Sequence, residues 1–304
     1  MSGGGEAGRG ALVRVACTAV RSAPAHRAEM VSQWLCGEAV QMLGREEGWV
    51  RARGPDGYEG WCLAGALLPA APGEVEAWSA AADRFSLGAR LLGPEEGHAH
   101  TAPDAGDAPA PTAAGPVSRF GTPPPRFLPW GARAAAAHDG RVRLPDGRAL
   151  LPGDPSRLPD PVALRARHPL RGSAVVGTAT GWLGTPYLWG GRTPEGADCS
   201  GMVQAVYAAH GVPLPRDSGD QLAAGPEAPG AAEDPAGRCP GDLLFFGASR
   251  TEVTHVAVCA GGTRIVHVAA ARGAASLDDL EELPKGLERL AERLVGVTRP
   301  LEVG

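Results

Sequence analysis

Short apolar runs separated by turn residues dominate the first 70 positions of the chain. They lie at 11–20, 31–34, 39–43 and 49–52, and the turn-rich segment Asp56-Gly-Tyr-Glu-Gly-Trp61 follows them. Runs of four to eight residues bounded by glycine, proline and polar residues are typical of β-strands. Their even spacing predicts a small antiparallel barrel, which we assign to residues 1–72.

Strand-and-turn patterns return at 85–92, 128–133 and 140–151. The segment between the first two, about 93–125, consists mostly of Gly, Pro, Ala, Thr and Asp, which cannot bury enough apolar surface to order itself. We interpret residues 73–158 as a second, more divergent barrel of the same kind that carries this disordered-looking insertion. An irregular connector is the alternative interpretation.

From residue 159 to residue 304 the pattern changes to mixed helix and strand. Apolar residues at helical spacing predict helices at 174–182 and 199–210, and a helical stretch at 277–294 that is broken at Pro284. Alternating and continuous apolar runs predict strands at 242–246, 251–260, 263–269 and 295–300. The third part of the chain is therefore expected to be one α+β domain.

Composition narrows the possible functions. The 44 glycines and 29 prolines favour turns and short strands over long helices, and the net charge of −5 gives no electrostatic basis for nucleic-acid binding. The sequence contains no stretch of about 18 apolar residues, so we expect no membrane span. The run at 11–20 is expected to be a strand rather than a signal peptide. A cytoplasmic location follows as an expectation.

Six cysteines are present, and in a reducing compartment we expect them to be free thiols. None stands at zinc-ligand spacing from other cysteines or histidines, so we predict no metal and no other cofactor. The oligomeric state is not encoded in any pattern that we find.

Cys199 has the most informative surroundings. It follows a glycine-rich turn and begins the predicted helix at 199–210, where unpaired backbone N–H groups and the helix dipole favour a thiolate. A lone cysteine is more often an inert core residue. Whether Cys199 is a nucleophile therefore depends on a nearby base.

Three histidines follow Cys199 in the same domain. His210 lies eleven residues further along the same helix, about 16 Å away at the usual helical rise, and is too distant. His255 and His267 lie on two alternating runs joined around 260–262. A three-residue loop centred on Gly261 would place the two rings directly opposite each other, whereas a two-residue Gly261-Gly262 loop would place them on opposite faces.

If the loop has three residues, Cys199, His255 and His267 can form a nucleophilic centre. Cys199 attacks, His255 takes the thiol proton and His267 orients His255. The chain contains no asparagine, so the orienting group must be His267, an acid or a carbonyl. An imidazolium beside the sulfur is expected to lower the pKa of Cys199. Two unrelated strand histidines are the alternative.

Several segments together resemble the NlpC family of papain-like cell-wall peptidases. They are Gly184-Thr-Pro-Tyr-Leu-Trp-Gly-Gly191, Asp198-Cys-Ser-Gly201, Pro240-Gly-Asp-Leu-Leu-Phe-Phe246, His255-Val-Ala-Val258 and Ile265-Val-His267. The first part of the chain, with Val20-Arg-Ser-Ala-Pro24, Gly48-Trp-Val50 and the 56–61 segment, is similar to bacterial SH3-like domains. The resemblance implies a papain-like cysteine peptidase domain preceded by two all-β SH3-like barrels.

The resemblance also implies supporting residues. Tyr187 would help to stabilise the oxyanion, and Asp198 and Ser200 would hold the D-glutamyl part of a substrate. Simple packing is the alternative for Tyr187.

In the turn Arg216-Asp-Ser218, Asp217 and Ser218 would bind substrate, and Tyr58 and Glu29 from the first barrel would complete with Asp217 a site for a free α-ammonium group. The alternatives are a barrel turn residue for Tyr58 and a solvated carboxylate for Glu29.

By this resemblance the protein is expected to be a cysteine endopeptidase of cell-wall peptide recycling. It would cleave the bond between γ-D-glutamate and a diamino acid in murein stem peptides that begin with a free L-Ala (L-Ala-γ-D-Glu-diamino acid). Two alternatives stay open: a non-enzymatic peptidoglycan-binding protein with a vestigial peptidase domain, and an amidase or acyltransferase that uses the same thiolate.

Overall fold

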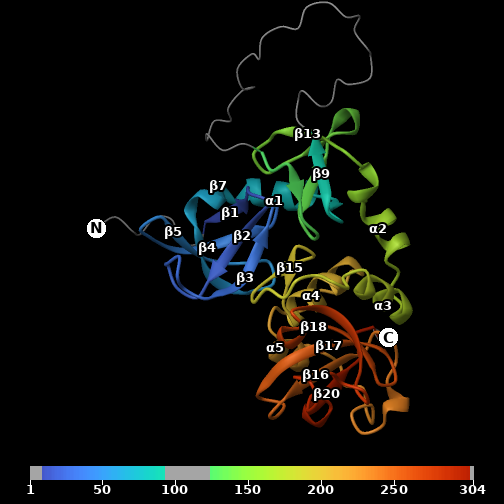
Figure 1. The fold of residues 1–304 in the computed structure, drawn as a ribbon. Helices are drawn as coiled ribbons and strands as arrows, with labels where there is room; N and C mark the ends of the chain where they lie inside the picture. Colours follow the sequence, from blue (N-terminus) through green and yellow to red (C-terminus); the bar gives the residue numbers. More distant parts are fainter. Residues whose placement is uncertain (1–8, 93–123, 302–304) are drawn as a thin grey trace, which may run out of the picture.

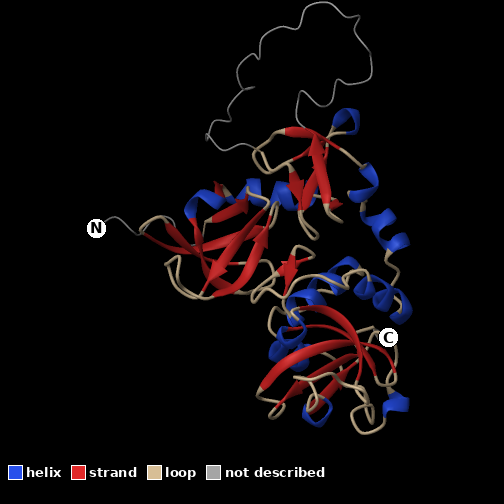
Figure 2. Ribbon diagram, viewed as in Figure 1, coloured by secondary structure: helices blue, strands red, loops and turns tan. Residues whose placement is uncertain are grey.

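A computed structural model describes residues 9–92 and 124–301 of the chain. The chain forms three lobes, which Figures 1 and 2 show as two β-rich lobes above a mixed α and β lobe. We call them the first barrel, the second barrel and the C-terminal domain.

The first barrel contains seven strands in the order β3-β2-β6-β5-β4-β1-β7. They are β1 (Gly10–Val13), β2 (Cys17–Arg21), β3 (Met30–Leu35), β4 (Ala39–Glu46), β5 (Trp49–Arg53), β6 (Glu59–Leu63) and β7 (Leu67–Ala70). The predicted single strand at 11–20 is wrong, because the chain changes partners there: β1 pairs with β4 and β7, whereas β2 pairs with β3 and β6. The break between them lets the sheet close on a core around Trp34, which is fully buried.

Helix α1 (Pro72–Ala81) follows the first barrel and was not predicted from the sequence. Pro72 suits the first helical turn, and the Glu74 carboxylate accepts a hydrogen bond from the Ala71 N–H, which this turn leaves unpaired. The buried Trp78 ring donates from Nε1 to the Gly37 carbonyl at 2.8 Å. The Trp78 contact therefore holds α1 in place, although the apolar residues of this helix do not form a clear apolar face in the sequence.

The second barrel has six short strands in the order β10-β9-β13-β12-β11-β8. They are β8 (Arg84–Phe85), β9 (Ala89–Leu92), β10 (Phe127–Leu128), β11 (Arg133–Ala136), β12 (Val142–Arg143) and β13 (Ala149–Pro152). Its core includes Leu35 and Cys36 of the first barrel, so the two barrels share one buried cluster. The predicted insertion at about 93–125 lies almost wholly outside the described residues.

Helix α2 (Pro161–Arg167) leads into the C-terminal domain and is capped by Asp160, which accepts hydrogen bonds from Val162 N and Ala163 N. The domain contains helices α3 (Gly172–Thr180), α4 (Cys199–Ala209) and α5 (Ser218–Ala224) and the two-stranded ribbon β14 (Arg192–Thr193) and β15 (Gly196–Ala197). Its main sheet has the order β19-β18-β17-β16-β20, from β16 (Leu243–Gly247), β17 (Val253–Gly261), β18 (Arg264–Ala269), β19 (Ala274–Asp279) and β20 (Leu294–Thr298).

Both faces of this sheet are covered. The three helices α3, α4 and α5 contact it and share a core with Phe245 and Val256. The other face buries Phe246 and Ala257 beneath Ala231 and Leu280, which belong to connecting segments. Burial on both faces explains why β16 is a continuous apolar run.

The helix predicted at 277–294 is wrong. Residues 274–279 form the edge strand β19, which pairs with β18 through six consecutive positions, and only Ala291–Arg293 forms a short 3₁₀ turn. Pro284 and Gly286 break the helical pattern, and the free edge of β18 provides hydrogen bonds that a broken helix cannot. This correction places another carboxylate beside His267, as described below.

The first barrel docks on the C-terminal domain through polar contacts. Arg192 binds Gln33 with its backbone N–H (3.0 Å to Oε1) and with Nη1 (2.8 Å to the carbonyl), and it pairs with Glu38 at 3.3 Å. Gln204 Nε2 of α4 donates to Asp56 Oδ2 at 2.9 Å. These contacts hold β3 and the 56–61 turn against the elements that carry Cys199.

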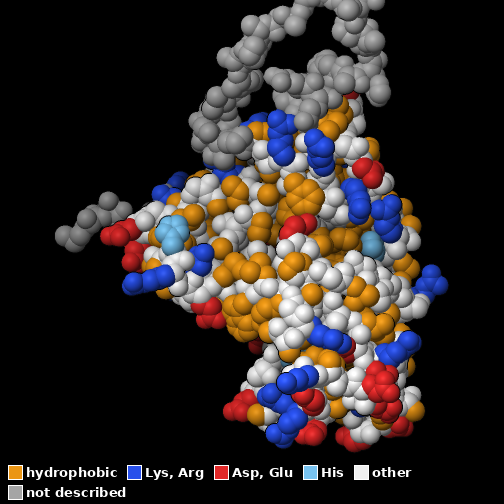
Figure 3. Space-filling view, viewed as in Figure 1, with side chains coloured by type: hydrophobic (Ala, Val, Ile, Leu, Met, Phe, Trp, Pro, Cys, Tyr) orange, Lys and Arg blue, Asp and Glu red, His pale blue; other side chains and the backbone are white. Residues whose placement is uncertain are grey.

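The visible face of the molecule mixes both signs of charge, and apolar side chains gather where the lobes meet (Figure 3). Among the described residues, no helix combines the length and the apolarity that crossing a membrane requires.

Candidate active site

Cys199 is the first residue of α4 and is half-buried. The N-cap residue Asp198 accepts a hydrogen bond from Gly201 N at 2.7 Å, and its other oxygen accepts one from Gly190 N at 2.8 Å. Gly201 must be glycine, because a Cβ there would lie 2.0 Å from the Gly191 carbonyl. The glycine-rich turn therefore wraps tightly around the first turn of α4 and fixes the position of the thiol.

The structure brings His255 and His267 together. Nε2 of His255 lies 2.8 Å from Nδ1 of His267, with the ring centroids 5.0 Å apart. Residue Val256, next to His255, donates its backbone N–H to the Cys199 sulfur, as does Ser200. The backbone next to His255 thus contacts the start of α4, which packs on β17 and β18.

The predicted register of the hairpin is wrong by two residues. Cys259 pairs with Ile265 and Val258 with Val266, so His255 and His267 are diagonal rather than directly opposite neighbours. A bulge near Gly261, where φ is +115°, moves the turn to Gly262 and Thr263. Diagonal positions share a face, and the long imidazole side chains span the extra distance.

Asp278 extends the pair of histidines and was missed by the sequence analysis. Its Oδ2 lies 2.8 Å from Nε2 of His267 and also accepts hydrogen bonds from Ser276 Oγ (2.8 Å) and Arg272 Nε (3.1 Å). Burial acts to raise the pKa of Asp278, but the hydrogen bonds from Arg272, His267 and Ser276 prevail and lower it, so the carboxylate is ionised. Ser276 pairs with His267 across the two strands, and Asp278 lies two residues further along the same face of its strand. This relation could not be recognised from the sequence because a helix was predicted for these residues.

The ionised Asp278 determines which ring nitrogen carries a proton in His267 and, through it, in His255. A carboxylate can only accept, so His267 donates from Nε2 and its Nδ1 carries a lone pair. That lone pair accepts the Nε2–H of His255, which leaves His255 Nδ1 unprotonated. His255 is therefore held in the tautomer that a general base for the thiol requires.

The resting thiol is neutral, contrary to expectation. Burial and the nearby Asp198 charge raise the pKa of Cys199 to about 11, although Val256 N–H, Ser200 N–H and Arg216 act in the other direction. Burial and the proximity of His267 lower the pKa of His255 to about 3. Burial also lowers the pKa of His267, although its hydrogen bond to Asp278 acts against that shift. The free site is a thiol beside a neutral imidazole rather than a thiolate–imidazolium pair.

Cys199 opens into a cleft of about 550 Å³ between the first barrel and the C-terminal domain, which we call the Cys199 cleft. The six residues predicted to bind substrate line it together with Cys199: Glu29, Tyr58, Asp198, Ser200, Asp217 and Ser218. Trp189, which is 56% exposed, and Asp220 also line it. The barrel thus supplies one wall of the cleft that contains the thiol.

Tyr58 and Asp217 join across this cleft by a hydrogen bond. Burial and the Asp217 charge raise the pKa of Tyr58 to about 12, so its hydroxyl is protonated and donates. Partial burial raises the pKa of Asp217, whereas Arg216 and Tyr58 act to lower it. Glu29, Asp217 and Asp220 give this end of the cleft three carboxylates that face solvent, which suits a cationic group.

Asp198 and Ser200 line the cleft, but their side chains are engaged inside the protein. The buried Arg216 donates to Asp198 Oδ2 at 2.7 Å, to Ser200 Oγ at 2.8 Å and to Ser32 Oγ of the first barrel at 3.2 Å. Arg216 therefore ties the barrel to the start of α4. No local pattern in the sequence indicates this role of Arg216, because it depends on tertiary contacts.

Tyr187 packs against the same core as Cys199. Burial, and to a lesser extent the proximity of Cys199 and Asp198, raises the pKa of Tyr187, so the phenol is protonated and can donate. No group of three or more His, Cys, Asp or Glu within residues 9–92 and 124–301 is arranged to hold a metal ion, and all six cysteines are free.

A helix-borne thiol, a histidine on the adjacent sheet and a polar residue that orients it define a papain-like cysteine peptidase domain. Residues 184–284 match the NlpC/P60 family, and residues 20–67 match the bacterial dipeptidyl-peptidase SH3 domain. The C-terminal domain is therefore an NlpC/P60 cysteine peptidase domain, and the first barrel is a bacterial SH3 domain, which confirms the predicted family resemblance and fold class.

Curated relatives match over part of the chain. A γ-D-glutamyl-L-lysine dipeptidyl-peptidase of Bacillus subtilis is 39% identical over 95 residues, which cover 31% of this chain and 30% of the relative. A protein of the same name from Bacillus cereus is 35% identical over 133 residues, which cover 42% and 37% of the two chains. The match thus spans about a third of the length of these relatives.

The whole arrangement of lobes is similar to a solved structure. A crystal structure of an NlpC/P60 family protein from Bacillus cereus superposes with a TM-score of 0.71 over 96% of this chain and 99% of that one, at 21% identity. The order of barrels and C-terminal domain is therefore a fold that both proteins share.

Proposed function

We propose that this protein hydrolyses the γ-D-glutamyl bond to a diamino acid in murein peptides that begin with a free L-Ala. The observation that carries the proposal is the hydrogen bond between Tyr58 of the first barrel and Asp217 of the C-terminal domain, which both line the cleft that contains Cys199. These two residues, from two lobes, are where we propose that the free amino group binds. The names of the two Bacillus relatives support γ-D-glutamyl-L-lysine as the cleaved unit.

The proposed reaction begins when the Cys199 sulfur attacks the γ-carbonyl carbon and His255 Nδ1 takes the thiol proton. His267 and Asp278 stabilise the resulting positive charge on His255 through their hydrogen bonds. The Tyr187 hydroxyl and the Cys199 N–H, which has no helical partner at this position, stabilise the oxyanion.

The protonated His255 then gives its proton to the leaving amine of the diamino acid, and an acyl-enzyme forms on Cys199. Water, deprotonated by His255, releases the γ-D-glutamyl product and restores the thiol. Because the Asp198 and Ser200 side chains are held by Arg216, we assign their contribution to the shape of the cleft wall rather than to direct side-chain binding of D-glutamate.

The free amino group would bind between Asp217, Tyr58 and Glu29. A charged hydrogen bond contributes about 1.5–3 kcal/mol, so acetylating the substrate amine should lower kcat/KM by about 10- to 100-fold. Asp217→Asn should cause a similar loss for the free-amine peptide and almost none for the acetylated one. Glu233→Gln, which changes an exposed carboxylate that does not line the cleft, is the matched control for a general effect of charge.

The decisive experiment compares wild type with Cys199→Ser on L-Ala-γ-D-Glu-L-Lys and on its diaminopimelate counterpart. We expect wild type to release L-Ala-D-Glu and free diamino acid, and Cys199→Ser to release neither while it keeps the native circular dichroism spectrum. Binding without products in wild type would instead support a non-catalytic wall-binding protein. Transfer of the acyl group to an added amine in place of water would support an acyltransferase.

We propose a cytoplasmic location, because a cleft for short free-amine peptides suits fragments already released from the wall. Cell fractionation with an antibody to the protein tests it, and recovery from the wall or the medium would contradict it.

A further inference from the structure

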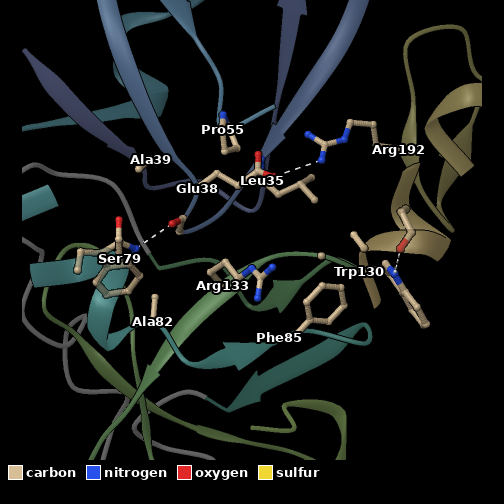
Figure 4. A pocket seen from close by; sticks show the side chains of 15 residues that line it. Leu35, Glu38, Ala39, Pro55, Ser79, Ala82, Phe85, Trp130, Arg133 and Arg192 are labelled. Carbon is tan, nitrogen blue, oxygen red and sulfur yellow. Dashed lines mark hydrogen bonds and ion pairs between the residues drawn. The ribbon is translucent and has the colours of Figure 1, made fainter. Parts of the chain in front are cut away.

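A second cavity, of about 310 Å³, lies where the first barrel, α1, the second barrel and the C-terminal domain meet. We call it the junction cavity (Figure 4). Leu35 and Glu38 come from the first barrel, Phe85 and Arg133 from the second, and Arg192 from β14 of the C-terminal domain. Ala205 and Ala208 of α4 also line it, so this cavity touches the helix that carries the nucleophile.

The charges in the junction cavity are unbalanced. Arg133 and Arg192 are its basic residues, and Glu38 is the one acidic residue among those that line it. Glu38 is already engaged, because Oε2 accepts the Leu35 N–H at 2.9 Å and Oε1 pairs with Arg192 at 3.3 Å. Asp56 lies near Glu38 but accepts hydrogen bonds from Gln204 and Tyr58 N outside the cavity lining. Burial lowers the pKa of Arg133 and Glu38 lies close enough to oppose this shift, but the ion pair of Glu38 is with Arg192, so two guanidinium groups share one carboxylate.

Arg133 also lacks hydrogen-bond partners. Its guanidinium stacks over the Phe85 ring at 4.7 Å, and burial lowers its pKa. Within residues 9–92 and 124–301, no oxygen accepts a hydrogen bond from this side chain, although a guanidinium carries five donors. Nε of the buried Arg192 likewise has no partner in the described part of the chain. A partly desolvated cation with free donors is costly unless something binds it.

We propose that the junction cavity binds a small oxyanion, a carboxylate or a phosphate, between Arg133 and Arg192. A guanidinium presents parallel N–H donors that match two oxygens of either group. Phe85, Trp130 and Leu35 give the bound molecule an apolar wall, and the volume restricts it to a small metabolite. Bound there, the anion bridges three lobes and contacts α4, so it stabilises their assembly around the Cys199 cleft.

The test measures thermal unfolding and calorimetric binding of the full chain with sodium phosphate or sodium glutamate, against sodium chloride at equal ionic strength. We expect at least one of the two anions to raise the midpoint of unfolding saturably and to bind with one site per chain. The arm that responds identifies phosphate or carboxylate as the group recognised. No saturable effect of either anion beyond chloride would overturn the proposal.

Variants separate the site from general charge effects. Arg133→Gln should weaken binding tenfold or more. Because the Arg133 side chain makes no hydrogen bond within the described residues and contacts Phe85 only by stacking, the unliganded variant should unfold close to the wild-type temperature. Arg143→Gln is the matched control, since Arg143 stacks over Trp78 at 5.8 Å but does not line the cavity. Equal anion affinity in Arg133→Gln and wild type would overturn the proposal, whatever the activity of either protein.

Discussion

Replacing Asp278 by Asn tests how much the negative charge beside His267 contributes to catalysis. Asn can still accept the Nε2–H of His267 through its side-chain oxygen, so the tautomer can persist while the negative charge is lost. Asp278 is 6% exposed and does not line the cleft, so the substrate KM should not change. The loss should appear in kcat.

The hydrogen bond between His267 and Asp278, 2.8 Å long, strengthens when His255 accepts the thiol proton. A hydrogen bond to a charged group contributes about 1.5–3 kcal/mol, and 1.36 kcal/mol corresponds to a tenfold change in rate. We therefore expect kcat to fall about 10- to 100-fold. Steady-state hydrolysis of L-Ala-γ-D-Glu-L-Lys, followed by chromatography of the products, gives kcat and KM separately.

Two comparisons make this prediction refutable. Asp279→Asn changes the neighbouring carboxylate, which accepts the Glu281 N–H, and should leave kcat unchanged. In a His267→Ala background, Asp278→Asn should have little further effect, because Asp278 acts through His267. A kcat within twofold of wild type, or losses that add fully in the double variant, would refute the reasoning.

Three further predictions concern stability. Burial lowers the pKa of His168 to about 4 and that of His255 to about 3, whereas an unfolded histidine titrates near pH 6.5, so the unfolded chain binds more protons as the pH falls. The free energy of unfolding measured in urea should therefore fall between about pH 6.5 and pH 4, by up to about 1.4 kcal/mol per pH unit for each ring, and His168→Gln should flatten this dependence. Gly190→Ala should lower the midpoint of thermal unfolding, because φ is +77° and the new Cβ would lie 2.5 Å from the Met30 carbonyl; an unchanged midpoint contradicts this contact. Arg216→Met should cost about 3–5 kcal/mol in denaturant unfolding, because it leaves Asp198 buried beside an apolar chain; a loss below about 1 kcal/mol would show that the ion pair is dispensable.

Local patterns in the sequence identified most of the elements that carry the chemistry. The helix that begins at Cys199 and the strands that carry His255 and His267 lie within one or two residues of their predicted bounds. Glycine-rich turns, caps and alternation are encoded within a few neighbouring residues, so these features were legible without tertiary information. The resemblance to NlpC peptidases and SH3-like domains then indicated that residues distant in sequence share one cleft, which the structure places there.

The tertiary structure alone decided how these elements meet. The diagonal register of the two histidines depends on a bulge near Gly261, and Asp278 reaches His267 only because residues 274–279 complete the edge of the sheet. Arg216 gains its role from Ser32, 184 positions away, and Arg133 faces a cavity formed by three lobes. Such pairings arise from packing between distant segments, and no local pattern of apolar and polar residues specifies them. The sequence by itself indicated the nucleophile and its base. Pairing of β17, β18 and β19 in one sheet determined the chain from His255 through His267 to Asp278, and docking of the barrels determined the walls of the cleft and the excess of positive charge at the junction.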